Sequence, residues 1–210
     1  SGALKQVTTH DYVYGLGFSA DDTQVAYLPR SGTRAPFRSC LRVMDVATRS
    51  SRELVCDTQA LRFTWSDIRW SPDNSEVYFQ AQVDGDRNRV QLVAVDLTAT
   101  KPAVRVLTDP RQQRTDASAL EGWVDNDGLL FTANDDGFGN LYSYSRKSKQ
   151  VRQLTRFTDD LSSARLVDAG VFAVHRSPMG SSLALVDPRT GKILGEQPQR
   201  GKADVIDGHA

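Results

Sequence analysis

The stretch Trp70-Ser-Pro-Asp-Asn-Ser-Glu-Val-Tyr-Phe79 decides the fold, because its pattern returns at intervals along the chain. A strand ends at the tryptophan, a polar turn follows, and an apolar strand begins at the valine. Asp and Asn tolerate the positive φ angles of tight turns, so the pattern predicts a β-hairpin. Related stretches occupy Phe18–Tyr27, Trp123–Phe131 and, in a degenerate form, Leu166–Val174.

A second hairpin follows the first in every copy. Its strands alternate apolar and polar residues at a period of two, as half-buried strands require. We place these strand pairs at Leu41–Val46 with Arg52–Val55, Val90–Asp96 with Val104–Thr108, Asn140–Tyr144 with Val151–Thr155, and Ser182–Asp187 with Lys192–Leu194.

Each repeat therefore holds four strands, and the spacing of the repeats identifies the architecture. Anchors at Phe18, Trp70, Trp123 and Arg165 are 52, 53 and 42 residues apart. Four-stranded units of this length are typical of propeller blades. We predict an all-β fold, a β-propeller with blades at 17–56, 68–109, 121–156 and 163–196. A sandwich of short strands competes, but it does not explain the recurring order of turns and strands.

The N-terminal segment resembles part of a further blade. Leu4–Thr8 closely matches Val151–Thr155, which is the last strand, strand D, of the third repeat. We therefore expect an orphan D strand at 4–8, four complete blades and a tail at 197–210, all within one propeller domain or segment spanning 1–210. The orphan strand either closes the ring by strand exchange, within the chain or in a dimer, or marks the chain as an excerpt of a larger propeller.

Composition excludes some partners. Basic and acidic residues number 26 each, so there is no global attraction to nucleic acid, and we expect none to bind. No apolar run approaches the roughly 20 residues that span a bilayer, so no membrane insertion is expected. The sequence leaves periplasmic or other extracytoplasmic and cytoplasmic locations open. Cys40 and Cys56 flank a predicted hairpin; separate buried thiols are the favoured interpretation, with a disulfide as the alternative.

The chain offers no recognisable catalytic centre, metal site or cofactor site. Gly17-Phe-Ser19-Ala-Asp21 lacks the second glycine of a G-x-S-x-G elbow, and the repeat places Ser19 in a turn. The three histidines, His10, His175 and His209, show no metal-ligand spacing. Paired aspartates fall at turns, where Asp is common. A lyase or hydrolase site in a propeller funnel would need a histidine and carboxylate cluster that the sequence does not display.

The loops between the second and third strands of each blade, the B–C loops, are the best candidates for binding. In a propeller they emerge on the same face as the D–A connections between blades. Arginine and aromatic residues, which dominate binding hot spots, gather there. The alternative is a merely solvated loop face. The candidate binding residues are Arg34, Phe37, Arg38, Arg87, Arg89 and Phe138.

These motifs carry a family resemblance that covers essentially the whole chain. Trp70–Asn74 resembles the W-S-P-D-G turn of TolB-like propeller repeats. Phe131–Tyr144, followed by Val151–Thr155, resembles blades of the tricorn protease and of prolyl oligopeptidase-family enzymes, including dipeptidyl peptidases. The resemblance implies either of two roles. In the peptidases a non-catalytic propeller gates or filters peptide substrates beside a separate hydrolase domain, whereas TolB binds another protein. The long repeat spacing favours the peptidase type.

Overall fold

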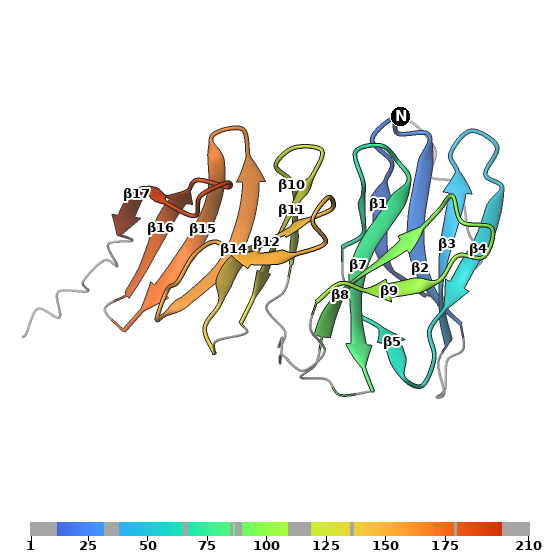
Figure 1. Cartoon of the computed structure of the whole chain (residues 1–210), viewed down its shortest axis with the longest axis horizontal. Coiled ribbons are helices and arrows are strands. Elements are labelled where there is room, and N and C mark those ends of the chain that lie inside the picture. The colour runs from blue at the N-terminus through green and yellow to red at the C-terminus, as the bar shows by residue number, and fades with distance from the viewer. Residues whose placement is uncertain are drawn as a thin grey trace, which may run out of the picture.

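A computed structural model describes residues 12–31, 38–64, 67–84, 86, 90–108, 119–134, 137–178 and 180–198. Within these ranges every regular element is a β-strand, arranged in four antiparallel sheets. The sheets stand side by side (Figure 1), with the fourth, drawn in orange to red, at the end farthest from the first. This arrangement confirms the predicted all-β fold of four propeller blades.

Each blade is one sheet. Blade 1 holds β1 (Tyr12–Phe18), β2 (Gln24–Ser31), β3 (Arg38–Asp45) and β4 (Ser51–Cys56). Blade 2 holds β5 (Leu61–Phe63), β6 (Arg69–Trp70), β7 (Glu76–Val83), β8 (Val90–Asp96) and β9 (Val104–Val106). It has five strands instead of the predicted four and begins before residue 68, because β5 and β6 both pair with β7. Blade 3 holds β10 (Leu120–Trp123), β11 (Gly128–Ala133), β12 (Asn140–Ser145) and β13 (Val151–Gln153). Blade 4 holds β14 (Asp160–Val167), β15 (Gly170–Ser177), β16 (Gly180–Val186) and β17 (Ile193–Pro198).

The Trp70–Phe79 motif contains the turn between the first two strands of a blade. Asp22 and Asn74 both take a φ of 56° at equivalent points of their turns. The Ser71 hydroxyl donates to the Asp73 carboxylate at 2.6 Å, and the Ser19 hydroxyl donates to Asp21 at the same distance. These side chains satisfy the turn locally, so the repeated Ser-x-Asp pattern specifies the hairpin.

The first strands of blades 1 and 4 are longer than predicted. β1 begins at Tyr12 instead of residue 17, and β14 begins at Asp160 instead of 163. Both carry a register shift, between Val13 and Leu16 and between Ser162 and Arg165. A bulge breaks the alternation on which the sequence prediction relies. β17 continues to Pro198, into the predicted tail, whereas the predicted orphan strand at 4–8 lies outside the described residues.

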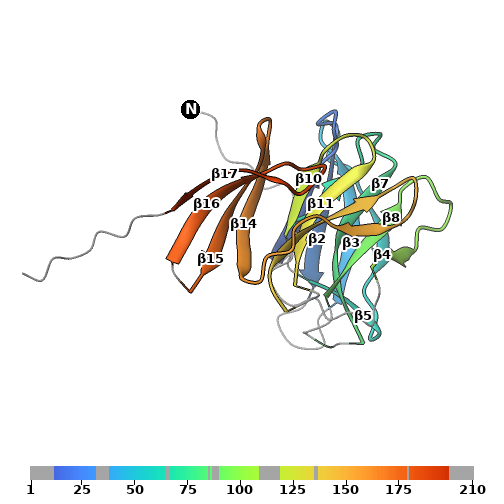
Figure 2. The same ribbon diagram turned by 60° about the vertical axis from the view of Figure 1, so that its left-hand side comes forward.

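Apolar side chains between neighbouring blades form the core. One cluster joins Ala26, Leu28, Leu41 and Val43 of blade 1 to blade 2, and a second joins Tyr78 and Leu92 of blade 2 to blade 3. A third joins Leu130 and Leu141 of blade 3 to Val171, Ala184 and Val186 of blade 4. Figure 2 shows the third and fourth blades face to face. Stability thus comes from contacts between sheets that follow one another in the chain.

Two tryptophans join the innermost strands of successive blades. The Trp70 indole N–H donates to the Gly17 carbonyl at 2.8 Å, and the Trp123 indole N–H donates to the Trp70 carbonyl at 2.6 Å. A side chain at Gly17 would collide with the Ile68 backbone, because its Cβ would lie 2.1 Å from the Ile68 oxygen. The close approach of blades 1 and 2 therefore depends on a glycine beside a tryptophan.

Candidate functional site

In blade 3 the end of the B–C loop contacts the D–A connection to blade 4. Asn140, at the end of the third B–C loop, is fully buried. Its side-chain oxygen accepts from the Phe157 amide at 2.8 Å, and its side-chain nitrogen donates to the Phe157 carbonyl at 3.2 Å. The Leu161 amide donates to the Gly139 carbonyl at 2.9 Å. These bonds hold the start of β12 against the connection between β13 and β14.

Two of the six candidate binding residues lie in the described part of the chain. Phe138, in the third B–C loop, is 41% exposed, and Arg38 is exposed at the start of β3. Arg34, Phe37, Arg87 and Arg89 lie outside the described residues. The six therefore remain a prediction for this face, which we call the loop face.

The loop face also carries a histidine that sequence reasoning treated as isolated. His175 Nδ1 lies 2.9 Å from the Glu196 carboxylate, and its ring is 4.4 Å from the Phe157 ring, centre to centre. The Ser182 hydroxyl donates to the same Glu196 oxygen, so Ser182 is bonded to the acid and not to a histidine base. Both hydrogen bonds hold the pKa of Glu196 below its ordinary value. This geometry orients His175 without creating an activated nucleophile.

A row of charged residues follows the innermost strands of blades 2, 3 and 4. Arg69, on β6, donates from Nε to the Leu120 carbonyl at 3.0 Å and pairs with Asp67 at 3.4 Å. Glu121 lies on β10, and Arg165 lies on β14, which contacts β10. One carboxylate oxygen of Glu121 is buried and has no hydrogen-bond partner among the described residues. Innermost strands line the centre of a propeller, so this row can present ionic groups to a ligand there.

Burial raises the pKa of Glu121 to about 7, with Asp67 raising it further and the arginines Arg69 and Arg165 opposing the shift. The carboxyl group therefore changes charge near neutral pH, a property that clusters at functional sites. This property could not be predicted from the sequence, because an isolated glutamate in a strand has no recognisable motif.

We expect Glu121→Gln to change the pH dependence of stability. A folded-state pKa above the ordinary 4.5 means that ionisation opposes folding, so wild-type stability declines as pH rises from about 4.5 through 7. The variant stays neutral and should be more stable at pH 8 by about 1–2 kcal/mol, after allowance for solvent screening. Urea unfolding at pH 4.5 and pH 8 measures this difference. Asp67→Asn, which changes a more exposed neighbour, is the control and should leave the dependence of the unfolding free energy on pH in place. The same pH dependence in wild type and Glu121→Gln would contradict the assignment.

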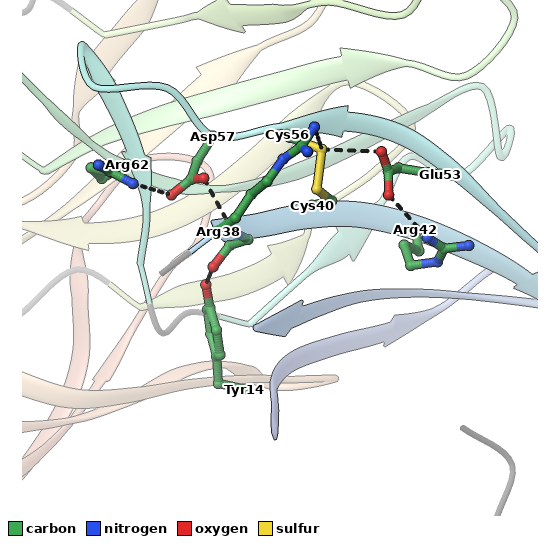
Figure 3. Close-up of a disulfide and its surroundings, with 9 residues drawn as sticks. Tyr14, Arg38, Cys40, Arg42, Glu53, Cys56, Asp57 and Arg62 are labelled. Atoms are coloured by element: carbon green, nitrogen blue, oxygen red, sulfur yellow. Dashed lines mark hydrogen bonds and ion pairs between the residues drawn. A yellow bond between two sulfur atoms is a disulfide. The ribbon is translucent and has the colours of Figure 1, made fainter. Parts of the chain in front are cut away.

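The two cysteines are joined in a disulfide, which corrects the interpretation as separate thiols. Cys40 on β3 and Cys56 on β4 are directly opposite in the sheet register, a relation that the predicted hairpin allowed but did not specify. Figure 3 shows the Arg38 guanidinium against Cys56, with 3.2 Å between Nη2 and Sγ. Glu53 lies close enough to both cysteines for the three to form a metal site, but the two sulfur atoms are bonded to each other and cannot bind a metal as thiolates.

Hydrogen bonds beside the disulfide fix the end of blade 1 at the loop face. Tyr14 and Ser39 share a hydrogen bond between their hydroxyls. The Asp57 carboxylate accepts from the Ser39 amide at 3.1 Å and pairs with Arg62 at 3.3 Å. These contacts, also drawn in Figure 3, connect β1, β3 and the D–A connection after β4. The end of the first B–C loop, like that of the third, is therefore hydrogen-bonded to the neighbouring D–A connection.

Four sequential sheets define a β-propeller region. The sequence profile of the dipeptidyl peptidase IV (DPP IV) N-terminal region matches residues 5–164. The chain therefore belongs to the family of DPP IV N-terminal regions. A sequence search of curated proteins finds no match.

Solved structures share this fold at low sequence identity. TolB from Acinetobacter baumannii is 20% identical with a TM-score of 0.65, over 91% of this chain and 45% of TolB. A putative dipeptidyl aminopeptidase IV from Bacteroides ovatus is 15% identical with a TM-score of 0.66, over 85% of this chain and 32% of that one. A puromycin-hydrolyzing peptidase from Mycobacterium tuberculosis is 14% identical with a TM-score of 0.63, over 93% and 30%. The chain thus spans less than half the length of each.

Proposed function

We propose that this chain is the propeller part of a serine peptidase, where it gates or filters peptide substrates for a separate hydrolase part. The match of residues 5–164 to the DPP IV N-terminal region carries the proposal. Several structures with the same fold bear peptidase names, which agrees with it. On this proposal the propeller itself performs no catalysis, and the substrate meets its loops and its charged central row.

The site contributes two features that suit a filter. Arg38 and Phe138 have exposed side chains near the ends of B–C loops, and the inner strands carry the Arg69–Asp67 ion pair beside Glu121, whose carboxyl group changes charge near neutral pH. The Cys40–Cys56 disulfide favours an oxidising, extracytoplasmic setting, because disulfides persist there and are rare in the cytosol.

A TolB-like role in binding another protein is the second candidate. The likeness to TolB over 91% of this chain favours it, and the loop face would then dock a protein in place of a peptide. Ring closure by a second copy or by an exchanged strand is compatible with either role. Apolar side chains on β1 and β16 suit such closure, since Leu16 and Phe18 are 54% and 55% exposed and Leu183 is 40% exposed.

The complete reading frame separates the two roles. The peptidase proposal expects a downstream region with a G-x-S-x-G elbow, and full-length protein that cleaves a chromogenic dipeptide amide until the elbow serine is changed to alanine. A complete frame without a hydrolase region, in a protein that cleaves no peptide, would leave the TolB-like role.

Within the full-length peptidase, we expect Arg38→Glu to act on binding. Reversing this charge at the loop face should raise KM for a long acidic peptide about tenfold, while KM for a dipeptide amide and both kcat values stay unchanged. Lys101→Glu, an exposed charge in the turn between β8 and β9, is the matched control. Equal effects of the two variants, or equal effects on long and short substrates, would remove Arg38 from the filter.

A further inference from the structure

An arginine recurs at one position of the last strand in three blades. The registers make Arg52, Arg105 and Arg152 equivalent, because they pair with Val43, Ala94 and Ser143 at the same point of their sheets. The pairing of the third strand with the second shows in the same way that Gln24, Glu76 and Gly128 are equivalent residues at the start of the second strand. Each arginine therefore lies near the junction with the next blade, beside a different residue in each case.

The junction of blades 2 and 3 shows what this arginine does when a carboxylate is present. Glu76 is only 8% exposed, and it accepts hydrogen bonds from Arg105 at 2.7 Å and from Tyr78 at 2.5 Å. Arg146 of blade 3 adds a bond to Glu76 at 3.2 Å and one to Asp73 at 3.0 Å. These donors hold the pKa of Glu76 below its ordinary value despite burial. The carboxylate is thus fully coordinated between two blades.

The junction of blades 3 and 4 keeps the arginine and lacks the carboxylate. Gly128 occupies the position of Glu76. Pro188 occupies the position of Arg146, because the residues two places earlier, Val186 and Tyr144, are equivalent in the sheet register. A cavity of about 440 Å³ takes their place, lined by Gly128, Ser143, Ser145, Arg152, Pro188 and Arg189 among others. The described partner of the Arg152 guanidinium is a backbone carbonyl, that of Arg189, and no carboxylate.

Blade 1 carries a glutamine at the equivalent position. Gln24 occupies the glutamate position beside Arg52, and the cavity that they line measures about 220 Å³. Cavity size therefore increases from glutamine to glycine at one position. With the strand register unchanged, the larger cavity lies where the side chain is missing.

The two aspartates at the edge of the larger cavity are already bonded. Asp125 accepts from the amides of Asp127 and Gly128 at 2.8 and 3.0 Å, and it lies 3.9 Å from the Arg189 guanidinium. Asp127 accepts from the Lys147 amide at 2.7 Å and from the Ser145 hydroxyl at 2.8 Å. Both carboxylates stay ionised in their turn, because these bonds lower their pKa values. Of the two arginines that line the cavity, Arg189 lies beside Asp125, whereas Arg152 has no carboxylate partner among the described residues.

We propose that the cavity between blades 3 and 4 is a binding site for a carboxylate group, which Arg152 receives as Arg105 receives Glu76. The Ser143 hydroxyl stands where Ala94 has a methyl group and supplies a second donor. A charge-assisted arginine–carboxylate hydrogen bond, like the one between Arg105 and Glu76, accounts for selection of a carboxylate over a neutral amide. The volume suits a small molecule, and the carboxylate comes either from a free acid or from an acidic side chain of a peptide.

The probes are propionate and the peptide N-acetyl-Ala-Glu-Ala-amide, with propionamide and the glutamine peptide as neutral counterparts. Nitrogen–proton NMR of arginine side chains follows Arg152 in the 210-residue chain. We expect a saturable shift at Arg152 with the carboxylates and none with the amides. Saturation by propionate alone identifies a free-acid site, whereas tighter binding of the acidic peptide identifies a peptide site.

Two variants test the assignment independently. Gly128→Glu supplies the missing carboxylate, and the glycine tolerates a side chain, since its Cβ would lie 3.4 Å from Ser143 Oγ. We expect this variant to abolish propionate binding and to unfold at a higher temperature than Gly128→Gln. Arg152→Gln, an exposed position, should weaken propionate binding about tenfold or more, followed at the Gly128 backbone amide because the Arg152 signal is lost, whereas Arg52→Gln should leave it unchanged.

Three results would overturn the proposal. The first is the absence of a saturable Arg152 shift with either carboxylate probe, which would mean that the cavity holds solvent only. Another is unchanged propionate binding in Gly128→Glu. The third is an equal loss of binding in Arg52→Gln and Arg152→Gln, which would indicate a general effect of surface charge.

Discussion

Replacing Trp70 by alanine is expected to destabilise the chain by about 3–5 kcal/mol, the usual cost of deleting a buried aromatic ring. Trp70 is 5% exposed and belongs to the core between blades 1 and 2. Its loss also leaves the Gly17 carbonyl without the indole donor. Guanidinium unfolding followed by far-UV circular dichroism measures the difference without relying on the fluorescence of the residue removed.

Two comparisons separate the ring from its hydrogen bond. Trp70→Phe keeps an aromatic ring and should cost about 1–2 kcal/mol, mostly from the unpaired carbonyl. Trp123→Ala removes a ring that is only partly buried and should cost less than Trp70→Ala. A loss below about 1 kcal/mol for Trp70→Ala would show that the tryptophan does not join the first two blades.

Removing the disulfide is the second change with a large expected effect. The bond closes a short loop between residues 16 apart, so the Cys40→Ala, Cys56→Ala double variant should lose about 3 kcal/mol. The loss arises mainly because the unlinked chain gains entropy when it unfolds. Reduction of the wild-type protein with dithiothreitol should lower its stability by a similar amount, and thermal unfolding with and without the reductant measures it.

The double variant is also the control for reduction. Dithiothreitol should have no effect on it, since no other cysteine occurs in the sequence. If reduction left the wild-type unfolding midpoint unchanged, the sheet hydrogen bonds between β3 and β4 would be sufficient to constrain this loop, and the disulfide would have no stabilising role.

The repeat in the sequence was sufficient to predict the four blades, because each blade is built from local signals. Turn residues such as Asp73 and Asn74 satisfy their own backbone, and the period-two pattern that follows them specifies strands that pair with their chain neighbours. Strand starts were less predictable. At β1 and β14 a bulge interrupts the alternation, so the first half of each strand carries no clear pattern.

The candidate sites depend on contacts between blades, which the sequence does not display. Glu121 is distinctive only because neighbouring strands bury it beside Arg69 and Arg165. From the sequence, Gly128 is an ordinary turn glycine, and only the sheet register shows that it is equivalent to Glu76. The pairing of Cys40 with Cys56 required the register of two adjacent strands, and a one-residue slip would have moved their side chains to opposite faces.

The order of strands has a consequence for how the protein is made. Within the described residues the pairings join strands that follow one another in the chain, except that β5 pairs with β7, and the disulfide of blade 1 joins the adjacent strands β3 and β4. Contacts so local in sequence form early and quickly. A ribosome adds only about 5–20 residues each second, so blade 1 can close its four strands before blade 3 has been synthesised. Each finished blade then presents an apolar face on which the next can fold, so synthesis itself sets the order of assembly.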